Sequence, residues 1–330
     1  AALLVEQGYD VTGVYMKNWT QDLPGMRCPW ADDLADAKRV AVQLGIDFKV
    51  FDFEQEYRHH VVEYMIDEYK AGRTPNPDIM CNQEVKFKLF LNAALEDGAD
   101  LIATGHYART ENGQLLLAAD ENKDQTYFLY RVTQRALEKT LFPLGEYTKP
   151  QVREMATERG LFTAAKKDSQ GICFVGQIGI REFLSEYIET KPGNIVDKQS
   201  RAIVGRHDGA IFYTLGQRHG LDIGGGLPYY VVGKDMEKNE VYVSTNLNDE
   251  NIWRGDIVLT YEHWINGVQP DDGTYQVRIR HRAPLVFAEM SLAIEEVRLS
   301  LTESQRAVAA GQSVVVYRDG RCLGGGIVRS

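Results

Sequence analysis

The sequence has few cysteines, no long apolar run, no internal repeat and no low-complexity tract. Four cysteines in 330 residues are too few for a disulfide scaffold, and none lies near enough to another for the ligand spacing of a zinc ribbon. Such cysteines suit a reducing compartment, where paired thiols are catalytic or redox-active. No apolar run approaches the ~20 residues of a membrane-spanning helix, and the first residues lack the pattern of a signal peptide. We therefore expect a cytoplasmic protein without membrane contact.

Length and charge bound the class of protein further. A chain of 330 residues exceeds one simple hydrophobic core, so two or three domains are expected. The formal net charge of −10 argues against general affinity for nucleic acid, although it leaves room for a local basic face. Charge therefore has to be read segment by segment.

The first half of the chain alternates helical and strand patterns. Residues 1–8 have the pattern of the end of a helix without a preceding cap, so we expect further residues before them. The expected elements are then strands at 11–16, 47–51 and 101–104 and helices at 31–44, 54–70 and around 85–93. This alternation predicts a parallel sheet with covered faces, whose ligands bind beyond the carboxyl ends of the strands. Residues 16–19 and 104–106 are thus candidates for a nucleotide site.

The second half changes its period. A hairpin at Asn112-Gly113 and helices at 148–160 and 177–188 are expected before Pro192-Gly193 ends the helical pattern. The expected strands are 210–215, 229–232, 241–244, 257–261, 275–280, 286–294, 314–317 and 322–328. Regular short strands with tight turns predict a small β-barrel. We predict three domains, at 1–176, 177–248 and 249–330.

A proline-containing loop, Gly72–Asn82, stands between two helical patterns. Each of its prolines disfavours helical backbone at the residue before it, so Thr74 and Asn76 are expected to be extended. The loop ends in Asp78-x-x-Cys81, which places a carboxylate near a thiol. The alternative is a surface turn with a stray cysteine.

A second loop, Asp168–Phe174, holds Cys173 just after Lys166-Lys167, whose charges could lower the pKa of a thiol. If the fold brings Cys173 and Cys81 together, one thiol could carry activated sulfur and the other could resolve it by thiol–disulfide exchange. The alternative is two unrelated thiols.

Arginines alternate with other residues at Arg278, Arg280 and Arg282. In a strand, this spacing would place three guanidinium groups on one face with no acid among them. Such a row suits contact with phosphates, and the alternative is a solvated strand face.

Several of these strings together resemble one family, the tRNA-specific 2-thiouridylases (the MnmA/TrmU family). The similar segments run in order along the whole chain, and several are long and chemically unusual. They are 16–19 (MKNW), 73–82 (RTPNPDIMCN) with 86–88 (KFK), 103–107 (ATGHY), 123–129 (KDQTYFL), 167–174 (KDSQGICF), 214–221 (TLGQRHGL) and 322–326 (CLGGG).

The resemblance implies an α/β fold with a parallel-sheet, ATP-pyrophosphatase-type nucleotide-binding catalytic domain, a small central domain and a C-terminal β-barrel. It implies 2-thiolation of the wobble uridine of tRNA at the expense of ATP, with Mg²⁺ accompanying the nucleotide. The partners implied are the tRNA anticodon stem-loop and a sulfur-donor protein, either a cysteine desulfurase or a relay carrier. A location in the mitochondrial matrix is the alternative if the source is eukaryotic.

The resemblance also assigns roles to residues. Cys173 would carry a persulfide, Cys81 would attack it and leave a Cys81–Cys173 disulfide, and Asp78 would act as acid/base beside the uracil. Met16 and Gly105 would contact the nucleotide. The tRNA contacts implied are Asn76, Pro77, Asp78, His106, Lys123, Asp124, Gln125, Arg280, His281 and Gln312.

One part of the family pattern has no counterpart here. The family begins with a strand and a Ser-Gly-Gly-Val-Asp-Ser loop that holds phosphates at a helix N-terminus, and this sequence starts just after that point. Two other functions therefore stay open from the sequence. One is a ligase of the ATP-pyrophosphatase type that acts on a small molecule, and the other is a non-catalytic RNA-binding protein.

Overall fold

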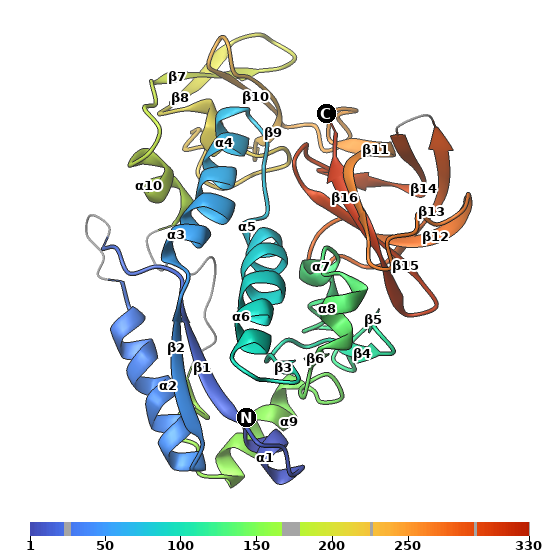
Figure 1. Cartoon of the computed structure of the whole chain (residues 1–330). Helices are drawn as coiled ribbons and strands as arrows, with labels where there is room; N and C mark the ends of the chain where they lie inside the picture. Colours follow the sequence, from blue (N-terminus) through green and yellow to red (C-terminus); the bar gives the residue numbers. More distant parts are fainter. Residues whose placement is uncertain (23–27, 167–178, 225–226, 294–295, 330) are drawn as a thin grey trace.

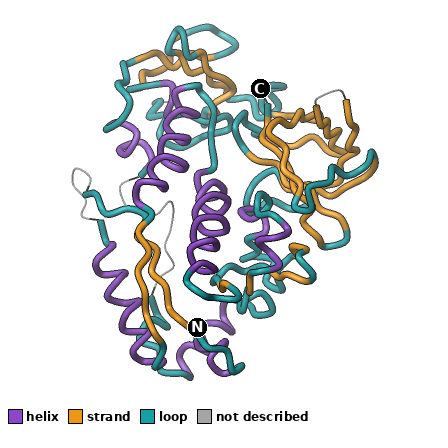
Figure 2. The backbone as a smooth tube through the Cα atoms, viewed as in Figure 1, coloured by secondary structure: helices purple, strands orange, loops and turns teal. Residues whose placement is uncertain are grey.

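A computed structural model describes residues 1–22, 28–166, 179–224, 227–293 and 296–329 of the chain. Three parts follow one another along the sequence: an N-terminal part (1–166), a central part (179–244) and a barrel (253–328) (Figure 1). Most helices lie in the N-terminal part, and strands dominate the other two (Figure 2). None of the helices within the described ranges has the length and apolarity that a membrane span requires.

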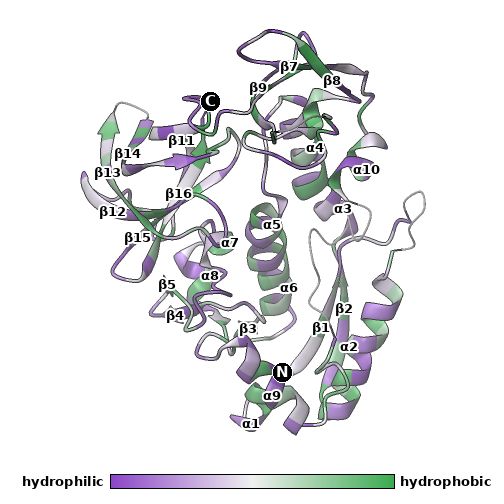
Figure 3. Cartoon of the chain, turned by 180° about the vertical axis from the view of Figure 1, so that it is seen from behind, coloured by the Kyte–Doolittle hydropathy of each residue, from purple (hydrophilic) through white to green (hydrophobic). Residues whose placement is uncertain are grey.

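Parallel strand pairs form the sheet structure of the N-terminal part. β1 (Thr12–Lys17) pairs with β2 (Asp47–Asp52), and β3 (Ile102–Ala103) pairs with β6 (Thr140–Leu141). The crossover between β1 and β2 is α2 (Trp30–Leu44), which ends at Gly45 in the left-handed conformation, φ 66°. Figure 3 shows hydrophobic and hydrophilic colours on different sides of α2, as expected for a helix that packs on a sheet.

Short helices complete this part. They are α1 (Ala2–Glu6), α7 (Thr126–Leu129), α8 (Gln134–Glu138) and α9 (Lys149–Glu158). The predicted helix at 148–160 begins with a capping box, in which the backbone N–H of Thr148 donates to Gln151 Oε1 at 2.8 Å.

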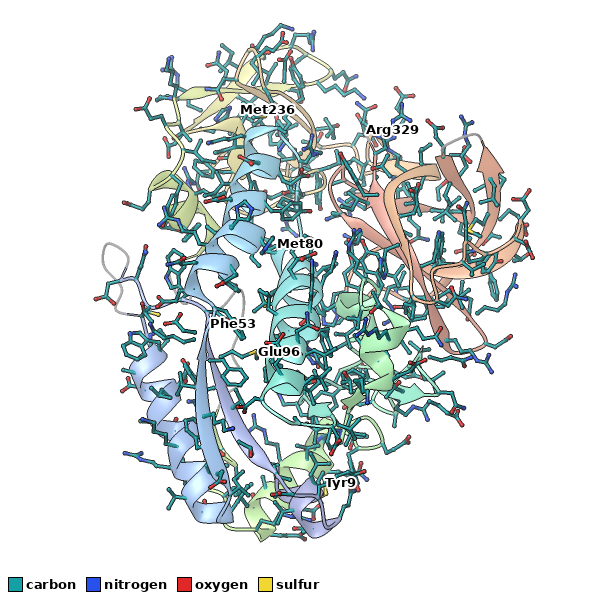
Figure 4. The ribbon with its side chains drawn as sticks, in the orientation of Figure 1. Tyr9, Phe53, Met80, Glu96, Met236 and Arg329 are labelled. Carbon is teal, nitrogen blue, oxygen red and sulfur yellow. The ribbon has the colours of Figure 1, made fainter. Side chains whose placement is uncertain are left out.

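Two continuous helical rods stand beside the strands. The first consists of α3 (Glu54–Tyr57), a π-helical segment (Arg58–Glu63) and α4 (Tyr64–Lys70). The second, which we call the central helix, consists of α5 (Pro77–Met80), a π-helical segment (Cys81–Phe90) and α6 (Leu91–Glu96). Figure 4 labels Met80, in its first turn, and Glu96, at its C-terminal end.

The predicted loop over residues 72–82 is wrong beyond its first five residues. Asn76 is extended, as expected, with φ −119° and ψ 93°, but Pro77 already begins the central helix. Proline fits the first helical position because its missing N–H has no partner there in any helix and its φ suits the helix. Asp78 and Cys81 therefore lie on a helix.

The central part is a small sheet with its own apolar core. Its elements are α10 (Ile180–Ser185), β7 (Gly193–Asp197), β8 (Ile203–His207), a 3₁₀ turn (Ala210–Phe212), β9 (Tyr230–Asp235) and β10 (Glu240–Ser244), with strand order β8-β7-β10-β9. The predicted strand at 210–215 is wrong, because the backbone turns where Tyr213 N donates to Ala210 O at 3.2 Å. Strands β7 and β8 were not predicted.

Six strands form a closed barrel at the C-terminal end. They are β11 (Trp253–Trp264), β12 (Gly273–Arg278), β13 (Val286–Ala293), β14 (Glu296–Arg306), β15 (Ser313–Arg318) and β16 (Arg321–Val328). Their order is β11-β14-β13-β12-β15-β16, and pairing of β11 with β16 closes the barrel. The predicted fold class, an α/β part with parallel strands, a small central part and a C-terminal barrel, is confirmed.

A hairpin of the N-terminal part extends the barrel sheet. β4 (Arg109–Glu111) and β5 (Gln114–Leu116) are joined by Asn112 and Gly113, whose φ angles of 50° and 74° are those of the tight turn predicted for this pair. Strand β5 pairs with β16 through Leu115 and Cys322. The N-terminal part and the barrel therefore share one continuous sheet.

Candidate active site

A cavity of about 880 Å³ lies among β1, β3 and the C-terminal half of the central helix. Met16, at the carboxyl end of β1, and Gly105, just after β3, both line it. The fold thus places the two residues predicted to contact a nucleotide in the wall of one cavity. Among the described residues, no group of three His, Cys, Asp or Glu side chains is arranged to hold a metal ion.

His106 and Gln125 line the same cavity. The imidazole of His106 is half-buried, with Nδ1 2.9 Å from Thr104 Oγ1 and the ring between Phe87 and Phe142, whose centroids lie at 5.7 and 6.2 Å. Burial, and next the charge of Lys86, hold the pKa of His106 well below its usual value, so the ring is neutral at pH 7. Gln125 is fixed to the backbone of Tyr107, from whose N–H its Oε1 accepts at 2.8 Å.

The first turns of the central helix carry the predicted acid and thiol. Asp78 and Cys81 are three residues apart, a spacing that puts two side chains on one face of a helix. Cys81 is buried, at 4% exposure, and Asp78 is half-buried. Burial raises the pKa of the Asp78 carboxyl, and the charge of Lys86 opposes that rise. A carboxyl with a raised pKa near a buried thiol suits acid/base work.

Two predicted base contacts, Asn76 and Pro77, lie where the central helix begins, and the residues before them are held from two sides. Thr74 N donates to Ala310 O of the barrel at 2.9 Å, and Thr74 Oγ1 lies 3.2 Å from Thr214 Oγ1 of the central part. The approach to Asp78 therefore depends on all three parts of the molecule.

Asp124, predicted to contact tRNA, is buried in a polar network at the junction with the barrel. Its carboxylate accepts hydrogen bonds from Ala118 N at 3.0 Å and Thr126 Oγ1 at 2.7 Å, and it pairs with Arg278 Nη1 at 2.5 Å. The exposed fractions of the two side chains are 1% for Asp124 and 9% for Arg278. Both groups are thus occupied inside the protein.

The predicted row of three arginines on one strand face is wrong. Strand β12 ends at Arg278, and Arg280 and Arg282 lie in the turn that follows, with φ +64° at Arg282. The sequence pattern did not reveal that a distant acid, Asp124, pairs with Arg278. Arg280 and Arg282 are exposed.

The other predicted tRNA contacts are spread over the barrel side. His281 is half-buried, and its ring lies 4.5 Å from that of Phe128; burial, followed by the charges of Arg282 and Arg278, lowers its pKa. Gln312 is half-buried in the turn before β15, where its Oε1 accepts from Ala309 N at 3.3 Å. Lys123 is half-buried in the turn before α7.

Cys173 and its loop lie outside the described residues, so its predicted encounter with Cys81 remains a prediction. Cys28 and Cys322, for which no function was predicted, are buried, and burial raises the pKa of both thiols. Sequence reasoning missed Lys86 as a site residue. The sequence places Lys86 four residues after Asn82 and five after Cys81. This spacing indicates proximity only once residues 77–96 are known to form a helix.

Family comparisons cover nearly the whole chain. The model for the tRNA methyl transferase HUP domain matches residues 1–177, that for the tRNA methyl transferase PRC-barrel domain matches 181–245, and that for the aminomethyltransferase beta-barrel domain matches 254–328. Two curated relatives, both named tRNA-specific 2-thiouridylase MnmA, come from Bacillus mycoides (strain KBAB4) and Bacillus thuringiensis (strain Al Hakam). Each is 45% identical over 335 residues, covering 99% of this chain and 90% of the relative.

Proposed function

The chain belongs to the family of tRNA-specific 2-thiouridylases, enzymes that transfer sulfur to tRNA, and from this premise we propose that it replaces the C2 oxygen of the wobble uridine by sulfur. The observation that carries the proposal is that the central helix bears Asp78 and Cys81 on one face of its first turns and, farther along, lines a cavity that Met16 and Gly105 also line. This arrangement offers a base, a thiol and a place for a nucleotide within one site.

The cavity is the proposed site of ATP. Its volume of about 880 Å³ suits a nucleotide-sized ligand, since ligand pockets commonly measure about 300–1,000 Å³. Mg²⁺ usually binds through substrate phosphates and one or two carboxylates, so it would enter with the nucleotide. The absence of a three-ligand metal cluster among the described residues is compatible with that mode.

The first proposed step turns the C2 oxygen into a leaving group. The uracil O2 attacks the α-phosphorus of ATP, an O2–P bond forms, and the bond to the β-phosphate breaks to release pyrophosphate. Asp78 accepts the N3 proton of the base as the new bond forms. Its raised pKa suits this task, because a general base works best when its pKa approaches the ambient pH.

The second proposed step transfers sulfur. The terminal sulfur of a persulfide on Cys173, supplied by a sulfur-donor protein, attacks C2, and AMP leaves with the electron pair of the C2–O bond. The Cys81 thiolate then attacks Cys173 Sγ, so that the S–S bond breaks and its electrons stay with the sulfur on C2. N3 regains the proton from Asp78. A dithiol reductant then returns two electrons to the Cys81–Cys173 disulfide.

The tRNA is proposed to lie across the central helix and the barrel. Asn76 and Pro77 would line the pocket of the extruded base, and neutral His106 could share a hydrogen bond with it. Lys123, Gln125, Arg280, His281 and Gln312 are the proposed contacts farther out. Asp124 is buried, so we assign it the role of fixing the segment that carries Lys123 and Gln125.

Mass spectrometry of the anticodon-loop uridine tests this function. The full-length protein is incubated with tRNA, ATP, Mg²⁺ and a persulfide source, and exchange of sulfur for oxygen is expected only with ATP present. Cys81→Ser and Cys173→Ser should each abolish thiolation while tRNA binding persists, because a hydroxyl cannot take part in thiol–disulfide exchange.

The matched control is Cys28→Ser, a buried cysteine whose Sγ lies 3.6 Å from Trp19 O, where a hydroxyl can donate in the same way. It should thiolate tRNA at close to the wild-type rate. Full activity of Cys81→Ser would refute the two-cysteine chemistry. Tight tRNA binding by a wild-type protein that never exchanges sulfur would instead favour the non-catalytic RNA-binding alternative.

A further inference from the structure

Lys86 occupies the wall that separates the nucleotide cavity from the acid and thiol of the central helix. It lines the cavity together with Met16 and Gly105. Its ammonium reaches back one turn along the helix and donates to Asn82 Oδ1 at 3.0 Å. Asn82 directly follows Cys81 and comes four residues after Asp78, so the ammonium lies within about one turn of both. Helical side chains lean toward the N-terminus, which accounts for this direction.

The charge of Lys86 is not neutralised by its known surroundings. Its partner Asn82 is a neutral amide, itself held because Asn82 Nδ2 donates to Phe128 O at 3.0 Å. No carboxylate among the described residues lies within ion-pair distance of Lys86. An ammonium has three donors, and Asn82 accepts one of them, which leaves donors for a ligand. The other lysine that lines the cavity, Lys49, is paired with Asp97.

The position of Lys86, in the cavity wall and with its ammonium about one turn from Asp78, lets its charge act on groups to both sides. Lys86 acts on the Asp78 carboxyl on the base side and on the His106 imidazole on the cavity side. The bond formed in the proposed first step joins uracil O2 to the α-phosphorus, which is the point where nucleotide and base meet. In the proposed reaction, a cation in this part of the cavity wall would face the reacting phosphate.

We propose that Lys86 is a catalytic residue of the adenylation step, whose ammonium binds the α-phosphate oxygens as uracil O2 attacks and pyrophosphate leaves. Negative charge on these oxygens is redistributed during the substitution, and a fixed cation in a partly buried site stabilises it without reorganisation. Asn82 is the positioning residue that aims the ammonium. This inference rests on the proposed function and adds a residue that acts on phosphorus, whereas Cys81 acts on sulfur.

Separate measurement of the two half-reactions tests the proposal. The full-length protein, Lys86→Met and Lys86→Arg are compared for tRNA-dependent release of pyrophosphate from ATP and for thiolation. Lys86→Met should lower kcat for pyrophosphate release roughly 10²-fold, the scale of losing one charged donor to a transition state. Its KM for ATP should rise by a smaller factor. Lys86→Arg should recover part of the rate, because it keeps the charge.

Lys88→Met is the matched control. Lys88 lies two residues along the same helix, is exposed, and pairs with Glu84 at 2.7 Å. Lys88→Met should retain the wild-type rates of pyrophosphate release and thiolation. All variants should retain the wild-type midpoint of thermal unfolding within a few degrees. Pyrophosphate release by Lys86→Met within twofold of wild type, or equal recovery of the rate by Lys86→Arg and by the uncharged Lys86→Gln, would overturn the proposal. If the wild type itself neither releases pyrophosphate nor thiolates tRNA, the proposed function fails.

Discussion

The N-terminal part meets the barrel and the central part through junctions that differ in their polar contacts. Toward the barrel, apolar packing of Ile265, Val315 and Tyr317 in the N-terminal core is joined by directional polar contacts. Tyr127 OH donates to Ser313 O at 2.9 Å, Tyr130 OH lies 3.1 Å from Ser313 Oγ, and the Asp124–Arg278 ion pair is buried. Toward the central part they are mainly apolar, since Phe183 of α10 is fully buried in the N-terminal core with its ring 6.1 Å from that of Trp19.

This difference determines which part can shift relative to the central helix. Hydrogen bonds and strand pairing fix both distance and register, whereas apolar side chains tolerate small displacements that keep their volume filled. The barrel is therefore held in one position relative to the central helix. The central part is held in place less specifically, although it contacts Thr74, the residue before the site that the barrel also contacts.

The largest expected effect comes from breaking the polar junction at Asp124. Asp124→Asn leaves Arg278 as a buried charge without its counterion, and such losses cost about 3–5 kcal/mol of the free energy of unfolding. Phe183→Leu at the apolar junction keeps most of the volume and should cost less than about 1.5 kcal/mol. Urea unfolding measures both. Equal costs at the two sites would contradict the contrast between the junctions.

A smaller effect is expected from adding one methyl group at each junction. Gly311 and Gly72 both have positive φ, but a Cβ at Gly311 would lie 2.8 Å from the backbone N of Thr74, while a Cβ at Gly72 would meet the flexible side chain of Met236 at 2.7 Å. Gly311→Ala should therefore cost about 2 kcal/mol, more than Gly72→Ala. It should also slow thiolation, because Thr74 leads into the site.

Gly267 supplies the control for backbone strain. It has φ +73° in a barrel turn, and a Cβ there has no atom within 4 Å, so Gly267→Ala reports the cost of positive φ alone. The excess of Gly311→Ala over this control measures the clash with Thr74. An excess near zero would show that the loop yields to the barrel.

The smallest expected effect concerns Lys234, at the edge of the central part. Burial lowers its pKa to about 8, and its ammonium donates to the neutral Tyr213 O at 2.9 Å, whereas Arg278 has an acid partner. Lys234→Met should raise stability by about 1 kcal/mol at pH 7, where the lysine is charged in both states and burial disfavours that charge.

The stability gain of Lys234→Met over the wild type should fall as pH rises. Between pH 8 and about 10 the unfolded chain still binds a proton that the folded chain has lost, so the wild type gains stability as pH rises through this window. The stability of Lys234→Met relative to the wild type should therefore fall between pH 7 and pH 10, and urea titrations at the two pH values measure this change. The exposed Lys191→Met is the control, and a difference independent of pH would contradict the assignment.

Local patterns were sufficient to predict much of the fold. The Asn112-Gly113 turn, the capping box at Thr148 and the β1–α2–β2 unit follow from a few adjacent residues each. Strand β14 was missed because its second half, residues 302–306, is entirely polar and shows no alternation. The start of the central helix was missed because Pro77, a helix breaker elsewhere, is favourable at the first position.

Only those parts of the site whose residues lie within one sequence motif could be predicted. Asp78 and Cys81 are neighbours in one motif, and the carboxyl ends of β1 and β3 follow from the expected sheet. The Asp124–Arg278 pair joins residues that are distant in sequence, so no local pattern contains it. Lys86 was recognised as a site residue only because the structure shows that it lines the cavity and that its ammonium donates to Asn82 one turn away.

The pairing of β5 with β16 sets an order of events during synthesis. Leu115 is made about 200 residues before its partner Cys322, so this sheet has very high contact order. Until then the β4–β5 hairpin has an open edge, and the hydroxyls of Tyr127 and Tyr130 lack Ser313. The core of the N-terminal part is therefore complete only after β16 has been made. Before that, the open edge of the β4–β5 hairpin can bind a chaperone or pair with another copy of the chain.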